Sequence, residues 1–190
     1  SQVSWTPLGV PASGSTGAAL ADGVYIFSFT QTDSAANVQS TASSLTVTVD
    51  TTPPTSTTVA LTSTDSGTSG DRVTNVAPVI GVTAEAGSTV AVTATKDGTA
   101  FTLFTGLSSI SGTGSQVSWT PLGVPASGST GAALADGVYV FSFTQTDSAA
   151  NAQTSASSLT VTVDTTAPTS TTVSLTSTDS GTSGDRVTNV

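Results

Sequence analysis

The stretch GVYVFSFT, from Gly137 to Thr144, places an aromatic residue at every second position. The stretch SLTVTVD, from Ser158 to Asp164, repeats this alternation with leucine and valine. Successive side chains of a β-strand point to opposite faces of a sheet, so a period of two predicts strands with one buried face. Between the two stretches lies TDSAAN, from Thr146 to Asn151, which is rich in turn-forming residues. The two stretches therefore predict neighbouring antiparallel strands.

The same alternation recurs upstream, with threonine, serine or small residues between the apolar positions. It is carried by Val59 and Leu61, Ile80 and Val82, Val90 and Val92, Phe101 and Leu103, and Val117 and Trp119. No stretch has a helical period or helix caps. Seven short strands within about 110 residues, separated by glycine, serine, asparagine and aspartate turns, predict an all-β, immunoglobulin-like antiparallel β-sandwich.

An internal repeat sets the organisation of the chain. Residues 1–76 align without a gap to residues 115–190, an offset of 114, and 70 of the 76 pairs are identical. A period of this length is too long for a solenoid unit and suits one autonomous domain per repeat. The fold class predicted is therefore tandem immunoglobulin-like antiparallel β-sandwich repeats of 114 residues, arranged end to end.

Two proline-containing linkers set the phase of the repeat. DTTPPT begins at Asp50 and DTTAPT begins at Asp164, each directly after an alternating stretch. We therefore predict that residues 1–50 are the C-terminal part of one repeat, residues 51–164 a complete repeat, and residues 165–190 the N-terminal part of the next. Neither part contains a whole sandwich, so we expect the chain to be a segment of a longer array whose partial repeats do not fold alone.

Composition excludes several classes of function. The 190 residues include no histidine, cysteine or methionine, so Ser-His-Asp and Cys-His catalytic sites, zinc sites and iron–sulfur sites are excluded. Twelve acidic and three basic residues give a net charge of −9, which is incompatible with a basic nucleic-acid surface. No apolar run reaches the roughly 20 residues that span a bilayer, so no membrane insertion is expected. Serine and threonine make up 71 residues, which suits the wet faces of strands.

Seven segments occur in a fixed order: VTVDTTAPT, TDSGTSGDRVTN, TAEAGSTVAVT, SWTP, LADGVY, TDSAAN and LTVTVD. In this order they resemble bacterial immunoglobulin-like repeats, the extender domains of giant RTX adhesins exported by type I secretion. The resemblance covers the whole chain and departs from the family in a longer stretch, GVPASGSTGA, from Gly123 to Ala132. It implies an extracellular location at the bacterial cell surface and Ca²⁺ bound at or near the domain junctions.

With histidine and cysteine absent, the acidic residues are the candidate binding residues of the chain. Strands that alternate in direction would place two acidic groups at opposite ends of a repeat, and end-to-end stacking would bring such ends together. The first junction would gather Asp22, Asp50, Glu85 and Asp147. The second would gather Asp65, Asp71, Asp136 and Asp164. Ca²⁺ binds six to eight oxygens in a tolerant geometry, and aspartate, asparagine, serine, threonine and glycine loops supply such oxygens.

The candidate Ca²⁺ ligands therefore include these eight residues and their counterparts in the partial repeats. The full set is Asp22, Asp33, Asp50, Asp65, Asp71, Glu85, Asp136, Asp147, Asp164, Asp179 and Asp185. The competing interpretation for each is a solvated residue or a turn that accepts hydrogen bonds from its own backbone. A hairpin turn explains Asp97, and the loop from Asp65 to Asp71 lacks the closing glutamate and the helices of an EF-hand.

The sequence thus predicts a non-catalytic structural spacer of a long bacterial surface adhesin. Ca²⁺ would rigidify the array so that it projects a distal adhesive domain, with neighbouring repeats of the same chain, and optionally other copies of the filament, as partners. Two alternatives stay open at this point. One is a glycan- or protein-binding module that uses its loops or Trp119, although a lone tryptophan on a strand is more often a core residue. The other is a linker domain of a secreted polysaccharide-degrading enzyme.

Overall fold

The described residues, 5–9, 17–176 and 179–189 of a computed structural model, form β-strands and loops and contain no helix. The partial repeat at the start contributes β1 (Gly23–Phe29) and β2 (Ser43–Val49). The remaining strands are β3 (Thr58–Leu61), β4 (Val73–Thr74), β5 (Ile80–Thr83), β6 (Thr89–Lys96), β7 (Thr99–Phe101), β8 (Ser109–Ser111), β9 (Gln116–Trp119), β10 (Gly137–Thr146) and β11 (Ser157–Val163).

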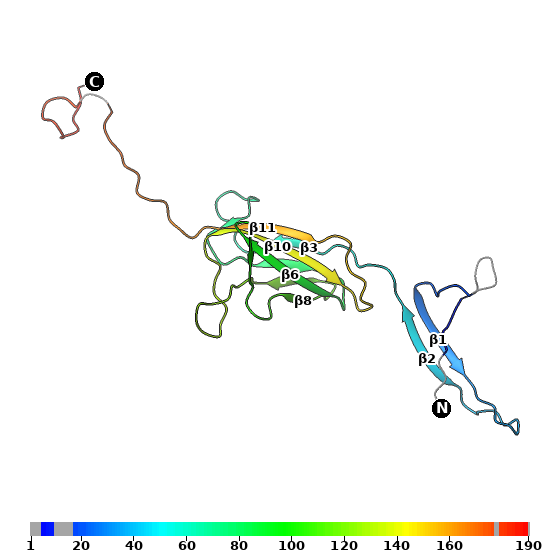
Figure 1. The fold of residues 1–190 in the computed structure, drawn as a ribbon. Helices are drawn as coiled ribbons and strands as arrows, with labels where there is room; N and C mark the ends of the chain where they lie inside the picture. Colours follow the sequence, from blue (N-terminus) through cyan, green and yellow to red (C-terminus); the bar gives the residue numbers. More distant parts are fainter. Residues whose placement is uncertain (1–4, 10–16, 177–178, 190) are drawn as a thin grey trace.

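Strands β3 to β11 form two sheets that pack as a sandwich (Figure 1). One sheet has the order β3-β5-β9, and the other has the order β4-β11-β10-β6-β7, with β8 also paired to β6. All pairs are antiparallel except β4 with β11, which run parallel. The predicted immunoglobulin-like, all-β fold is confirmed. Consecutive strands do not all pair, because the chain crosses between the sheets from β5 to β6.

The alternating stretches fill the core between the sheets. Tyr139, Phe141 and Phe143 of β10 are fully buried, and the apolar residues of β11 beside them are almost fully buried. Trp119 of β9 packs edge-on against Phe141 and Phe143, with ring centroids 5.5 and 5.8 Å apart. Trp119 is 6% exposed, so the interpretation of this residue as part of the core is confirmed.

A tyrosine corner stabilises the start of β10. The hydroxyl of Tyr139 donates a hydrogen bond to the Ala135 carbonyl oxygen, 2.8 Å away. Such a contact, from the start of a strand back to the backbone a few residues upstream, is a feature of immunoglobulin-like sandwiches. Tyr25 makes the same bond to Ala21 in the partial repeat, at 2.9 Å. The interpretation of both tyrosines as core or corner residues therefore agrees with the structure.

Two strands and one end of a third differ from the sequence-based expectation. β4 contains only two residues and β8 has a single apolar residue, Ile110, between two serines, so neither is long enough to show a period. β7 ends at Phe101, and Leu103 pairs only through an isolated bridge with Gly123. Gly123 also pairs with Ala132, so the longer stretch from Gly123 to Ala132 folds back on itself beside Leu103.

The two partial repeats lie on either side of the sandwich (Figure 1). β1 and β2 form a two-stranded sheet with the register of β10 and β11. Without a second sheet, Leu45 and Phe29 are 54% and 44% exposed, whereas their counterparts Leu159 and Phe143 in the sandwich are 3% and 0% exposed. Among the described residues after Asp164, no strand forms. These segments show the surfaces that a complete repeat buries.

Candidate functional site

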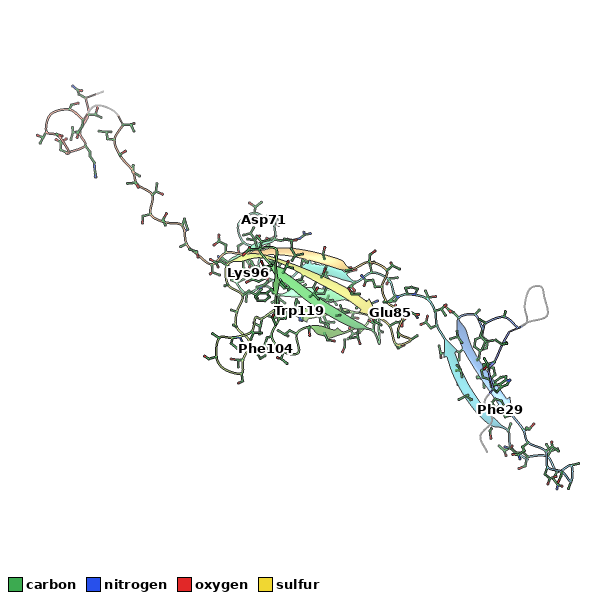
Figure 2. The ribbon with its side chains drawn as sticks, in the orientation of Figure 1. Phe29, Asp71, Glu85, Lys96, Phe104 and Trp119 are labelled. Atoms are coloured by element: carbon green, nitrogen blue, oxygen red, sulfur yellow. The ribbon has the colours of Figure 1, made fainter. Side chains whose placement is uncertain are left out.

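The acidic residues of the complete repeat are divided between two ends of the sandwich. We call the end next to the β1–β2 hairpin the near end and the opposite one the far end. Figure 2 shows Glu85 at the near end and Asp71 at the far end. The pairing of Gly137 with Val163 places Asp136 and Asp164 at the far end as well. These ends follow from the strand directions, because β10 runs from the far end to the near end.

At the near end, Asn151 links the complete repeat to the preceding one. Its Nδ2 donates to the Asp50 carbonyl oxygen at 3.0 Å and to Asp147 Oδ2 at 2.9 Å. Asp147 Oδ1 accepts hydrogen bonds from the Ala149 and Asn151 backbone N–H groups, each at 2.8 Å. Asp147 therefore orients the side chain that contacts the linker, and this use of its oxygens lowers its pKa.

A buried glutamine completes the near end. Gln145 is fully buried, and its Oε1 accepts a hydrogen bond from the Glu85 backbone N–H at 2.8 Å. Its Nε2 donates to the Thr55 carbonyl oxygen at 3.1 Å. The amide thus connects β10 to the segment before β3 and to the turn after β5. The Glu85 side chain itself is exposed.

The threonines of each linker bind an aspartate that lies directly before the last strand pair of the repeat, β1–β2 or β10–β11. Asp136 Oδ1 accepts hydrogen bonds from the Thr165 N–H at 2.8 Å and from the Thr165 hydroxyl at 2.7 Å, and its Oδ2 accepts one from the Thr166 hydroxyl. Asp22 makes the same three bonds with Thr51 and Thr52. We call each set the Asp–Thr–Thr clamp. It joins the linker after β2 or β11 to the turn before β1 or β10.

The clamp lowers the pKa of both aspartates. The Thr166 hydroxyl and then the two Thr165 donors lower the pKa of Asp136 from its usual 3.8 to about 2. The Thr52 hydroxyl has the leading effect in lowering the pKa of Asp22. The folded state favours the ionised Asp136 carboxylate. The contribution of this carboxylate to folding stability is therefore fully present above pH 3.8 and is lost as the pH falls through about 2. The clamp is therefore retained in mildly acidic solution.

The far-end loop from Asp65 to Asn75 contains a buried carboxylate oxygen that lacks a donor. Asp65 Oδ2 accepts from the Gly70 N–H at 2.6 Å, but Oδ1 is buried and finds no hydrogen-bond partner among the described residues. Asp71 Oδ1 accepts from the Val73 N–H at 2.9 Å, and the Ser66 hydroxyl donates to Asn75 Oδ1 at 2.8 Å. A buried anionic oxygen without a partner is costly, so this loop fits a bound cation.

The partial repeat at the end reproduces this loop without its sandwich. Asp179 Oδ2 accepts from the Gly184 N–H at 2.7 Å, and Asp185 Oδ1 accepts from the Val187 N–H at 2.9 Å. Asp179 Oδ1 is again buried and unpartnered within the described part of the chain. The loop conformation is therefore local, and its unpaired oxygen recurs with it.

The expected gathering of carboxylates at each junction is a prediction that the structure corrects. In residues 5–9, 17–176 and 179–189, no three acidic side chains come close enough to hold one metal ion. Instead, Asp22 and Asp136 bind linker threonines, and Asp50 and Asp164 accept from the N–H groups of Thr52 and Thr166, each at 3.1 Å. Asp33 binds Asn37 and the backbone of its own turn, as Asp147 binds Asn151. The carboxylates lie at the expected ends, but their oxygens accept hydrogen bonds from linkers and turns.

Several residues that form hydrogen bonds at the two ends were not predicted from the sequence. They are Thr51, Thr52, Thr165 and Thr166 of the linkers, and Gln145 and Asn151 of the near end. Both linkers keep the dipeptide Thr-Thr after aspartate, although the next position changes from Pro53 to Ala167. That retained pair was the available signal, because hydroxyls beside an aspartate are potential donors.

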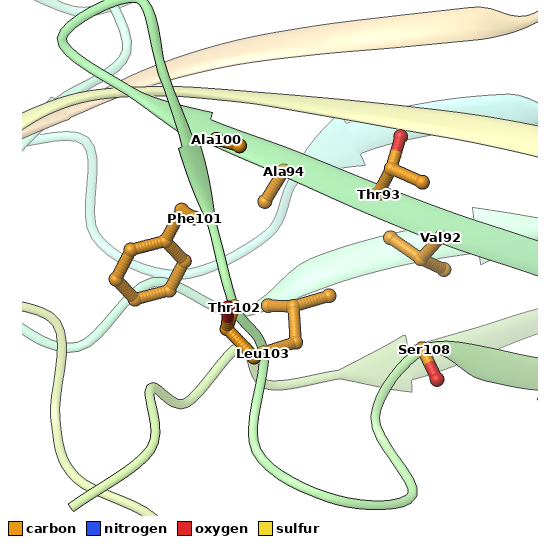
Figure 3. A pocket seen from close by; sticks show the side chains of 8 residues that line it. All are labelled: Val92, Thr93, Ala94, Ala100, Phe101, Thr102, Leu103 and Ser108. Atoms are coloured by element: carbon orange, nitrogen blue, oxygen red, sulfur yellow. The ribbon is translucent and has the colours of Figure 1, made fainter.

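Asp97 and a shallow hollow offer no further chemistry. Asp97 and Gly98, with φ of 49° and 79°, form the turn between β6 and β7, and Asp97 Oδ1 accepts from the Val138 N–H at 2.9 Å. A hollow of about 400 Å³ lies between β6 and the segment from Ala100 to Leu103 (Figure 3). Its lining side chains are aliphatic, aromatic or hydroxyl-bearing and include no charged group.

Comparison with known proteins places the complete repeat in a family. A family model described as bacterial Ig-like domain matches residues 52–165. No curated protein matches the chain significantly. Domains of this family are typically non-catalytic and are often extracellular or exposed on the surface. Within the part of the chain that the structure describes, no helix is long and apolar enough to cross a membrane. The chain belongs to the bacterial immunoglobulin-like domain family.

Proposed function

We propose that this chain is a segment of the spacer of a long bacterial surface adhesin, without catalytic activity, that holds a distal adhesive domain away from the cell. The observation that supports this best is the connection between repeats. The Asn151 side chain of one repeat binds the Asp50 carbonyl oxygen at the end of the preceding one. Near-identical copies joined by a short, attached linker suit a rod better than a recognition module, because Trp119 is buried in the core.

We further propose that Ca²⁺ binds the far-end loop. Asp65 and Asp71 would hold the ion in the complete repeat, and Asp179 and Asp185 would hold one in the next. When bound, Ca²⁺ would supply the positive charge that the buried Asp65 oxygen lacks. The backbone bonds from Thr162 N–H to the Arg72 carbonyl oxygen and from Asp164 N–H to the Thr74 carbonyl oxygen attach this loop to the end of β11. An ordered loop would therefore stiffen the end of the repeat at which the linker begins.

The extracellular setting suits such a site. Extracellular calcium modules bind with dissociation constants of about 10⁻⁴ to 10⁻³ M, which the ion concentration outside cells can saturate. The chain has no cysteine, so its stability depends on its core, its hydrogen bonds and any bound ion. Loops with carboxylate, amide and hydroxyl oxygens favour Ca²⁺ over Mg²⁺, which requires a stricter octahedral geometry.

Thermal unfolding with added Ca²⁺ tests this proposal on the 190-residue chain. At ten times the dissociation constant, an ion that binds only the folded state stabilises it by about 1.4 kcal/mol, so we expect the Tm to rise by roughly 5 °C. Asp65→Asn should abolish the rise. Asp179→Asn is the matched control, because it changes the same loop outside the complete repeat, and it should leave the rise intact. A Tm that does not respond to Ca²⁺, or responds equally to Mg²⁺, would contradict the calcium site.

A further inference from the structure

The linker is held by side chains on both sides of its prolines. On the upstream side, Asp22 binds the backbone and hydroxyl of Thr51 and the hydroxyl of Thr52. The complete repeat supplies the other contacts: Asn151 binds the Asp50 carbonyl oxygen, also upstream of the prolines, and Gln145 binds the Thr55 carbonyl oxygen downstream of them. Between these contacts lie Pro53 and Pro54, whose rings fix φ near −65°. The linker thus has few free backbone rotations.

The Asp–Thr–Thr clamp gives both oxygens of its carboxylate hydrogen-bond donors from the protein itself. In each copy, three donors reach the two carboxylate oxygens, with distances of 2.7–2.9 Å for the bonds from Thr51 and Thr165. Hydrogen bonds to an ionised acceptor are roughly twice as strong as neutral ones. The same geometry forms after β2, in a two-stranded sheet, and after β11, in a complete sandwich. It therefore depends only on the last hairpin and its linker.

The contact from Asn151 of the complete repeat is preorganised in the same way. In the partial repeat, Asn37 Nδ2 donates to Asp33 Oδ2 at 2.8 Å, as Asn151 Nδ2 donates to Asp147 Oδ2 at 2.9 Å. In both copies the aspartate therefore orients the asparagine amide, and Asn151 directs its remaining N–H at the Asp50 carbonyl oxygen. A side chain already held in its binding orientation loses little conformational freedom on contact.

From these contacts we infer that the Asp–Thr–Thr clamp is a metal-independent lock, which sets the direction of the linker as it leaves each repeat, and that Asn151 attaches that linker to the next repeat. The inference rests on the proposed spacer role and adds a second source of stiffness to it. The calcium loop stabilises the end of the repeat, whereas the clamp holds the chain that leaves it. Removal of calcium leaves the clamp in place.

Backbone dynamics of the ¹⁵N-labelled 190-residue chain in chelator test this inference. Thr165 and Thr166 follow a complete repeat, and we expect order parameters near the rigid value of about 0.85 for both. Asp136→Ala should lower them below about 0.6, since it removes all three acceptor contacts. Asp22→Ala is the matched control. It removes the other clamp and should leave Thr165 and Thr166 rigid.

The possible outcomes separate the clamp from the calcium site. Mobile Thr165 and Thr166 in chelator, or rigid ones in Asp136→Ala, would overturn the clamp. Rigid residues that do not respond to added Ca²⁺, together with an unresponsive Tm, would contradict the calcium site and leave the clamp intact. If Asp136→Ala does not fold, Thr165→Val with Thr166→Val removes both hydroxyl donors and leaves the Ala135–Gly137 turn unchanged. Mobility of residues 165–166 in that variant supports the clamp, and rigidity overturns it.

Discussion

Phe143→Ala is expected to lower the free energy of unfolding by about 3–5 kcal/mol. Phe143 is fully buried on β10 and packs against the edge of Trp119, with ring centroids 5.8 Å apart. The substitution removes this contact and leaves a cavity between the two sheets that the surrounding strands cannot fill. A loss of this size is a fifth or more of the stability of a typical domain, about 5–15 kcal/mol.

The chain contains a matched control for this substitution. Phe29 is the counterpart of Phe143 in the partial repeat, with the same neighbours in sequence, and it is 44% exposed (Figure 2). Phe29→Ala should therefore change the main unfolding transition by less than about 0.5 kcal/mol. Urea denaturation of both variants, followed by circular dichroism, measures the difference. Equal losses for the two substitutions would show that the complete repeat does not form the core described above.

Gln145→Ala is expected to cost about 2–4 kcal/mol, because it removes the only side-chain amide that joins β10 to both Glu85 and Thr55 in the described structure. The Glu85 N–H and the Thr55 carbonyl oxygen would lose partners at 2.8 and 3.1 Å. Both bonds are partly buried, and a polar group left without a partner in such a place costs about 1–3 kcal/mol. Burial makes the loss larger than for a surface glutamine, since Gln145 is fully buried.

Gln31 is the control for Gln145. It occupies the same position in the partial repeat, is exposed, and should tolerate replacement by alanine with little change in stability. Gln145→Glu is a second useful variant, since it keeps the shape but loses the donor to Thr55. The midpoint of urea denaturation should be lower in both Gln145→Glu and Gln145→Ala than in the wild type. A wild-type midpoint in Gln145→Ala would contradict the role assigned to this buried amide.

The sequence predicts a strand where the strand is long enough to show the two-residue alternation of apolar and polar side chains. Tyr139, Phe141 and Phe143 alternate over one strand, and their burial is complete. β4 and β8 were not expected, because two or three residues cannot establish an alternation. The pairing order also needed the structure, since periodicity predicts which face of a strand is buried but not which strand lies beside it.

The site was predicted less well than the fold, for a physical reason. Strand directions correctly place Glu85 and Asp71 at opposite ends (Figure 2). Charge repulsion alone suggested that carboxylates at one end need a shared cation. It neglected donors next to them in the chain, and the Thr165 and Thr166 hydroxyls bind Asp136 before any ion is needed. The orphaned oxygen of Asp65 could not be foreseen either, because it depends on the turn from Asp65 to Gly70.

Small-angle scattering of proteins with two, three and four consecutive copies of residues 51–164, in millimolar Ca²⁺, tests the spacer role most directly. If attached linkers hold the repeats in line, the maximum dimension should rise by the same increment with each added copy. A flexible linker would give increments that shrink, since the length of a freely jointed chain grows with the square root of the number of units. Equal increments are the result that this account predicts, and shrinking increments would contradict it.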